Sequence, residues 1–386
     1  MNKPLKILST PLVLSILLLI TLSSCSQSEK RTVFDIKEFI TDTITVPTHI
    51  NDRIYFWQVR HIENSDEVIT YLKDSDFMLY KYSIPKKEVL DSVSFKKFRP
   101  IYTDYLYKGE DSLFVLLENY KLVLITKKGE KHFDFKDIFK KEIDSLAYPG
   151  NKNNPINLRE NVISFSVATN RIREDFNSPN PNEILYNYIV QMVFENDSIK
   201  MLGKFNPYDP EILEKSYYET RHSFTPKANT ITYFYDYQNI IYQVDYKNQD
   251  TLIVQLNPTN YDWKKSKPIK YDSISNNYYL FNYVLNRYKI SNFIFDPYTG
   301  NSLFFIEKPI LYFKEDGSIV KAYETEITLF VLDEKLQIIK EVEIPQNIVN
   351  GPRYSFVTKN GLYLRIAEPF QNLDKNETLY YKINLY

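Results

Sequence analysis

Residues 221–256 read RHSFTPKANTITYFYDYQNIIYQVDYKNQDTLIVQL, a stretch with the pattern of one complete antiparallel blade. Large apolar or aromatic residues alternate with other residues in three segments, with the period of two that a half-buried β-strand requires. These segments are 231–237, 240–246 and 252–256. The polar breaks Gln238-Asn239 and Lys247-Asn248-Gln249 fit tight hairpin connections. With 223–226 as a short first strand, this stretch serves as a template for the rest of the chain.

The third strand of the template has a pattern that recurs along the chain. Tyr242-Gln243-Val244-Asp245 is a large apolar residue, any residue, an apolar residue and a small polar or acidic one. The other copies are 80–83, 123–126, 192–195, 330–333 and 381–384. Phe293-Ile294-Phe295-Asp296 is similar, but Pro297 and the apolar strand after it match the first two strands of the template instead. The repeats therefore predict six blades.

The last copy of the pattern lies just before Tyr386, with no fourth strand after it. Residues 41–46 have the alternation and the polar lead-in of a fourth strand, and they precede the first blade. Such a strand would pair the remaining open edge and seal a ring. We therefore predict an all-β protein, a six-bladed β-propeller of four-stranded antiparallel blades closed by an N-terminal strand. A pair of β-sandwiches is the alternative, because it would show similar short alternating strands.

The predicted propeller forms a single domain over residues 41–386. A blade cannot cover both of its faces alone, so we expect the ring to fold as one unit. The expected blade limits are 51–95, 100–135, 157–205, 221–256, 287–345 and 351–386.

The N-terminus has the order of a secretion signal. Lys3 and Lys6 precede an apolar run over 12–20, which is shorter than the roughly 20 residues that cross a bilayer. Leu22-Ser23-Ser24-Cys25 follows and resembles the lipobox of bacterial lipoproteins. The resemblance implies a signal peptide over 1–24, lipidation of Cys25 and a lipidated tether over 25–40. Cys25 is the only cysteine in the sequence, so a lipidated chain would have no thiol for a disulfide or for catalysis.

The lipobox, the length and the Tyr- and Asn-rich repeats together resemble a Bacteroidetes-type family of lipoproteins of unknown function with TolB-like propeller domains. The resemblance implies a place in the bacterial cell envelope, with the lipid in a membrane, expected to be the outer membrane. The propeller would face the periplasm or the cell surface. Ser26-Gln27-Ser28-Glu29 lacks the acidic cluster that the resemblance associates with surface export, which favours the periplasmic side.

Four long inserts would emerge on one rim of the propeller. They are 137–155, 171–185, 206–220 and 257–286. Tyr217, Tyr218, Tyr261 and Trp263 lie in two of them and are candidates to stack on a sugar ring or to anchor a protein partner. The alternative is that these side chains pack the inserts onto the ring.

Seven aspartates precede a Ser or Thr and then an aliphatic residue. They are Asp42, Asp91, Asp111, Asp144, Asp197, Asp250 and Asp272. Aspartate can cap a turn from which the hydroxyl residue begins a strand. The pattern also resembles the O-glycosylation sequon of Bacteroidetes-type envelope proteins, and the sequence leaves both explanations open.

Several classes of function have no support in the sequence. The 48 basic and 49 acidic residues give no electrostatic case for nucleic-acid binding. The four histidines have no metal-ligand spacing, and no phosphate-binding, dinucleotide or nucleophile-elbow motif occurs. We expect no cofactor, no metal, no catalytic residue and a monomer. The leading hypothesis is a lipid-anchored, non-catalytic binding module for a protein or ligand. The alternative is a glycan-binding or glycan-hydrolysing propeller with paired axial carboxylates.

Overall fold

The structure of the chain is a computed structural model. The structure describes residues 31–47, 59–73, 77–99, 102–109, 111–142, 147–149, 156–159, 161–169, 188–195, 198–205, 230–234, 238–245, 250–260, 263, 286–371 and 377–386. The chain divides into two units, Met1–Thr32 and Val33–Tyr386, and the second holds every strand given below. Among the described residues, no helix has both the length and the apolar character needed to cross a membrane.

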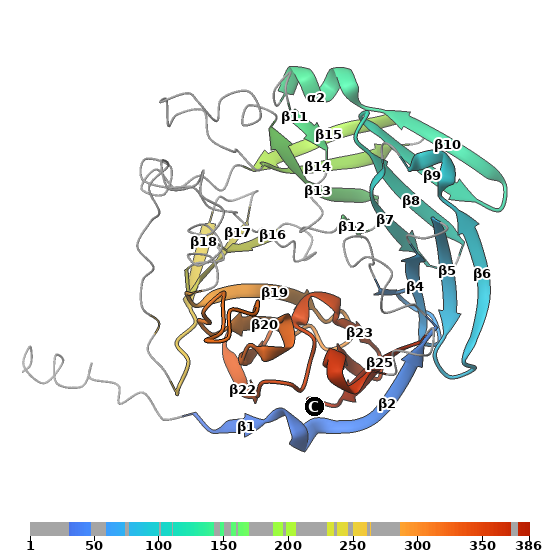
Figure 1. The fold of residues 1–386 in the computed structure, drawn as a ribbon. Helices are drawn as coiled ribbons and strands as arrows, with labels where there is room; N and C mark the ends of the chain where they lie inside the picture. The colour runs from blue at the N-terminus through green and yellow to red at the C-terminus, as the bar shows by residue number, and fades with distance from the viewer. Residues whose placement is uncertain are drawn as a thin grey trace, which may run out of the picture. The chain divides into compact units, whose positions relative to one another are not determined.

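The second unit is a six-bladed β-propeller of antiparallel blades, which confirms the predicted fold class (Figure 1). Blade one contains β3 (Arg60–His61), β4 (Val68–Lys73), β5 (Met78–Ser83) and β6 (Glu88–Ser94). Blade two contains β7 (Tyr102–Lys108), β8 (Ser112–Leu117), β9 (Lys121–Thr126) and β10 (Gly129–Asp134). Blade three contains β12 (Asn157–Arg159), β13 (Val162–Thr169), β14 (Tyr188–Glu195) and β15 (Ser198–Phe205), and β11 (Ala147–Pro149) also pairs with β13.

The remaining blades follow the same order. Blade four contains β16 (Thr230–Phe234), β17 (Ile240–Asp245) and β18 (Asp250–Gln255). Blade five contains β19 (Lys289–Phe295), β20 (Ser302–Glu307), β21 (Ile327–Leu332) and β22 (Ile338–Ile344). Blade six contains β23 (Phe356–Thr358), β24 (Gly361–Arg365), β25 (Thr378–Ile383) and β2 (Ile40–Val46). Short helices α2 (Lys136–Glu142), η1 (Ile36–Phe39), η2 (Lys96–Phe98), η5 (Ala322–Glu324), η6 (Pro352–Tyr354) and η7 (Glu368–Phe370) connect or extend the blades.

Blade four is the blade that the template stretch encodes. Its three strands are the second, third and fourth of the prediction, and the expected first strand at 223–226 lies outside the described residues. Tyr233 and Tyr242 pair across β16 and β17, and their rings stack with centroids 4.8 Å apart. The repeated third-strand pattern therefore corresponds to β17.

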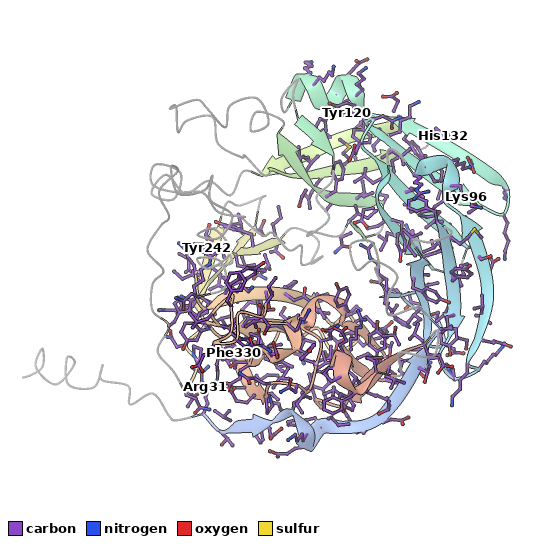
Figure 2. All side chains as sticks on the ribbon, viewed as in Figure 1. Arg31, Lys96, Tyr120, His132, Tyr242 and Phe330 are labelled. Carbon is purple, nitrogen blue, oxygen red and sulfur yellow. The ribbon has the colours of Figure 1, made fainter. Side chains whose placement is uncertain are left out.

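Period-two alternation sends successive side chains of one strand to different neighbouring blades. In β8, Leu113 and Val115 join a buried cluster with blade one, whereas Phe114 and Leu116 join a cluster with blade three. Blade five divides its side chains in the same way, and Phe330 of β21 is fully buried in the cluster shared with blade four (Figure 2). Each blade thus needs both neighbours to bury its apolar residues.

The N-terminal segment closes the ring. Strand β2 pairs antiparallel with β25 from Ile40–Ile383 to Val46–Thr378, which confirms the predicted closing strand. Lys340 Nζ donates to the carbonyl of Leu385, so β22 of blade five also holds the C-terminal residues. Closure therefore joins residues from both ends of the second unit.

The folded unit also includes residues that the sequence assigned to the tether over 25–40. Strand β1 (Val33–Asp35) pairs in parallel with β22, opposite Glu341–Glu343, and leads through η1 into β2 (Figure 1). Asp35 caps η1, with its carboxylate 2.9 Å from the Lys37 amide. Ile36 is fully buried in the cluster between blades five and six, and this burial offsets the entropy lost in ordering the segment.

The structure describes five of the seven Asp-Ser/Thr-aliphatic positions at least in part. Ser112 and Ser198 each begin a strand, as the turn-capping explanation requires, whereas Asp250 is itself the first residue of its strand. Asp42 and Asp91 instead lie within the outer strands β2 and β6, where each carboxylate accepts from the following amide at 2.7 Å. Charged residues on an outer strand disfavour pairing with another chain, which explains these two without a turn. O-glycosylation stays a prediction.

Candidate interaction site at the seam of blades one, five and six

One of the predicted site residues lies in the described part of the chain. Trp263 is half-buried, its ring centroid lies 5.6 Å from that of Tyr288, and it packs against the core cluster that contains Phe234 and Leu256. Cys25, Tyr217, Tyr218 and Tyr261 fall outside the described residues. The structure thus places Trp263 in packing contact with blades four and five, and a role for any of the five residues in binding or lipidation remains a prediction.

A polar cluster forms where the connections between first and second strands of three blades meet. These connections are 62–67 of blade one, 296–301 of blade five and 359–360 of blade six. Because strands in a blade alternate in direction, such connections emerge on one rim, and consecutive blades bring them together. We call His61, Asp66, Tyr298, Lys359 and Tyr386 the seam site.

His61 and Tyr298 are the centre of the seam site, although they are 237 positions apart in the sequence. The Tyr298 hydroxyl oxygen lies 2.5 Å from Nδ1 of His61, and the two ring centroids are 5.6 Å apart. On the other side of the imidazole, Nε2 lies 3.4 Å from Oγ of Ser65, a buried hydroxyl that donates to the Ile62 carbonyl at 2.6 Å. The His61 ring is therefore held on both edges.

Both members of this pair are uncharged at neutral pH. Burial lowers the pKa of His61 to about 4. The negative charge of Glu67 opposes this shift, and the positive charge of Lys359 adds to it. Burial also raises the pKa of Tyr298 to about 12, and the nearby carboxylates Glu63 and Asp296 add to that rise. The neutral imidazole can accept a hydrogen bond from the phenol hydroxyl.

The turn that carries Tyr298 is stiffened by a buried carboxylate. Asp296 is buried; its Oδ1 accepts from the Tyr298 amide at 2.9 Å and its Oδ2 accepts from the Thr299 hydroxyl at 2.7 Å. This is the local side-chain-to-backbone bonding that aspartate makes in turns. The turn therefore presents Tyr298, which is 37% exposed, in one orientation.

Blades six and one are tied together beside this pair. Lys359 Nζ lies 2.6 Å from the exposed Asp66 carboxylate, and the Tyr363 hydroxyl donates to Glu67 at 2.9 Å. Tyr386, 52% exposed, completes the site. Partial burial raises the pKa of Tyr386, while hydrogen bonds with Thr299 and Asn301 oppose the rise. The C-terminal residue thus lies against the turn that carries Tyr298.

The seam site has the composition of a binding surface. Two partly exposed tyrosines stand on ordered backbone beside one cation and one anion, and tyrosine supplies large contact area with little entropy to lose. Within the described ranges, no three His, Cys, Asp or Glu side chains are grouped as a metal site would need. The sequence contained no local signal for this cluster, because its members come from three blades.

A comparison with solved structures supports the fold. No protein-family model matches the chain, and no curated protein matches it. A crystal structure of a member of the DUF4221 family from Bacteroides vulgatus is similar with 13% identity and a TM-score of 0.66, over 89% of this chain and 97% of that one. Regucalcin, a calcium-binding protein from Agrobacterium tumefaciens, has 9% identity and a TM-score of 0.44, over 92% and 96%. A luciferin-regenerating enzyme has 9% identity and a TM-score of 0.44, over 89% and 96%. At 13% identity, the likeness to the DUF4221 structure supports the β-propeller fold and says nothing of the activity of this chain.

Proposed function

We propose that this protein is a lipid-anchored propeller of the bacterial cell envelope that binds a protein partner through the seam site, without catalysis. The observation that carries the proposal is the exposure of Tyr298 and Tyr386 while both are held by hydrogen bonds: Asp296 accepts from the Tyr298 amide, and the Tyr386 side chain bonds with Thr299 and Asn301. A preorganised aromatic surface loses little conformational entropy on binding. Lys359 and Asp66 at its border would orient the partner.

The protonation of the central pair favours binding over acid–base catalysis. An efficient general acid or base has a pKa near the working pH. The pKa of His61 is lowered to about 4 and that of Tyr298 is raised to about 12, so at neutral pH the imidazole is a weak base and the phenol a weak acid. The pair is better suited to accepting and donating fixed hydrogen bonds.

The lipid anchor is supported by Leu22-Ser23-Ser24-Cys25. We expect Cys25→Ala to move the protein from the membrane fraction to the soluble fraction, because the thioether bond needs the sulfur. Detergent-dependent membrane association of the variant would contradict a lipid anchor at Cys25. Protease treatment of intact cells then separates a periplasmic from a surface location.

Photo-crosslinking in intact cells tests the seam site. A benzophenone amino acid at position 298 should give a discrete higher-mass adduct, and the same amino acid at Leu90, an exposed residue on the outer strand β6, is the matched control. Lys359→Glu in the position-298 protein should weaken the adduct by reversing the charge at the border of the site. No adduct at position 298, or the same adduct at both positions, would refute a partner at the seam.

A further inference from the structure

The interface between blades three and four differs from the other five interfaces of the ring. Buried apolar clusters join blade one to two, two to three, four to five, five to six and six to one. In the part of the chain that the structure describes, no such cluster joins blades three and four, the green and the yellow strands of Figure 1. The chemistry of this interface therefore depends on the other side chains that face it.

The side of blade three that faces blade four carries polar side chains. Phe165 of β13 and Met192 of β14 point towards blade two, where both belong to the shared apolar cluster. Successive residues of a strand point to opposite faces, so Ser164, Ser166 and Gln191 point towards blade four. All three are buried, with Ser166 fully inaccessible and Gln191 9% exposed. Blade three therefore places hydroxyl and amide groups in a region that water does not reach freely.

Two polar atoms on this side are buried without a hydrogen bond. Gln191 Nε2 donates to Ser164 Oγ at 3.2 Å, which fixes the orientation of the amide. The remaining amide atom, Gln191 Oε1, and the hydroxyl oxygen of Ser166 have no hydrogen-bond partner within the described structure. A buried polar atom that lacks a partner lowers the stability of the folded state. A bound molecule with hydroxyl groups would supply both missing hydrogen bonds.

Blade four presents two stacked tyrosines to this interface. Phe234 of β16 and Ile241 of β17 belong to the cluster shared with blade five, so the adjacent Tyr233 and Tyr242 point towards blade three. The two rings are 9° from parallel, and both side chains are half-buried; Tyr242 is labelled in Figure 2. The serines and the glutamine of blade three and these tyrosines are all uncharged. An ionic ligand would therefore lose its hydration here without gaining a counter-charge from them.

We propose that a small neutral sugar or polyol binds between blades three and four. Its hydroxyl groups donate to Gln191 Oε1 and share a hydrogen bond with Ser166 Oγ, and the tyrosines of blade four cover its less polar carbon-bound surface. A hydroxyl group can both donate and accept, which matches an amide oxygen and a serine hydroxyl on the same face. Sites for small molecules combine aromatic walls with a few placed polar groups in this way. The site is independent of the seam site, which lies on blades one, five and six.

Thermal unfolding of the full-length protein with added sugars tests the site. The compounds are glucose, galactose, N-acetylglucosamine, maltose and myo-inositol, each titrated separately. We expect at least one of them to raise the Tm in a saturable way, by about 3 °C at about one hundred times its Kd. Ser166→Ala and Gln191→Leu should each abolish the shift. Ser166→Ala should not lower the Tm of the ligand-free protein, because the hydroxyl that it removes makes no hydrogen bond.

Gln243→Leu is the matched control for Gln191→Leu. Gln243 lies on the third strand of blade four, as Gln191 does on that of blade three, and its Nε2 lies 3.5 Å from the Thr232 hydroxyl oxygen. It shares the face of Ile241, which points towards blade five. The sugar-induced shift should therefore persist in Gln243→Leu.

Each outcome decides for or against the site. A shift that is lost in Ser166→Ala and Gln191→Leu but kept in Gln243→Leu supports the proposal. A shift that persists in either of the first two variants, or that is lost in all three, would overturn it. No shift with any of the five compounds would also overturn it and would assign the unpaired atoms to buried water. Circular dichroism shows which variants fold, and if Gln191→Leu does not, Ser166→Ala decides, since it removes a single oxygen atom.

Discussion

Arg60 and Asp104 form an ion pair between the first two blades, with Nη2 and Oδ1 2.8 Å apart. The Asp104 side chain is almost fully buried, and its Oδ2 accepts from the Ile156 amide, just before blade three, at 2.7 Å. The Arg60 guanidinium also lies 5.0 Å from the centre of the Tyr105 ring. One buried carboxylate therefore links residues of three consecutive blades.

Asp104→Asn should destabilise the protein by about 3 kcal/mol, because it leaves the Arg60 guanidinium without its counter-charge in a buried position. Urea unfolding followed by circular dichroism measures the change. Asp111→Asn is the control, since the side chains of the Asp111–Lys127 pair are both exposed to solvent and the loss of this pair should leave the urea midpoint almost unchanged. Similar losses in the two variants would show that burial of the pair is unimportant.

The stability of the protein should fall as the pH falls from about 6.5 to about 4 through His61. The pKa of His61 is lowered to about 4 in the folded protein, whereas an unfolded histidine titrates near 6.5. In this window the unfolded chain binds a proton that the folded chain does not, so acid favours unfolding. Urea midpoints at pH 7 and pH 5 should differ less in His61→Asn than in the parent protein. Parallel pH profiles would rule out His61 as a source of the slope.

Gly361→Ala should prevent stable closure of blade six. A Cβ at this position would lie 2.4 Å from the carbonyl oxygen of Ile383, which is backbone and cannot rotate away, and φ is +132°. Gly129 has a similar φ of +124° but open space around the position of a Cβ. Gly129→Ala therefore has the backbone strain alone, about 1–3 kcal/mol. Thermal unfolding should show a clearly larger loss for Gly361→Ala, and equal losses would exclude the steric contact.

Ile36→Ala should cost about 3 kcal/mol, because the residue is fully buried between blades five and six and the truncation leaves a cavity. The control is Ile339→Ala on the exposed side of β22, for which we expect about 0.5 kcal/mol or less. Urea unfolding of both variants tests whether the segment before β2 is part of the cooperative fold. An Ile36→Ala protein as stable as the control would show that η1 contributes nothing to closure.

The strand pattern could be predicted from the sequence because it depends on local alternation. Leu113, Phe114 and Val115 show the limit of that prediction. Their alternation indicates a strand with two covered faces, but the assignment of Phe114 to blade three and of its neighbours to blade one depends on the ring. The three-residue strand β1 has too little periodicity to be recognised, and its partner β22 lies 308 positions later along the chain.

The sequence by itself determined the six repeats, the order of strands in each and the N-terminal strand that closes the ring, because hydrophobic period and turn residues are local properties. Only the tertiary structure decided which distant groups meet. His61 and Tyr298 become neighbours because the turns of blades one, five and six converge on one rim. The burial that lowers the pKa of His61 and keeps its imidazole neutral likewise exists only in the closed ring, since desolvation requires the surrounding blades to be in place.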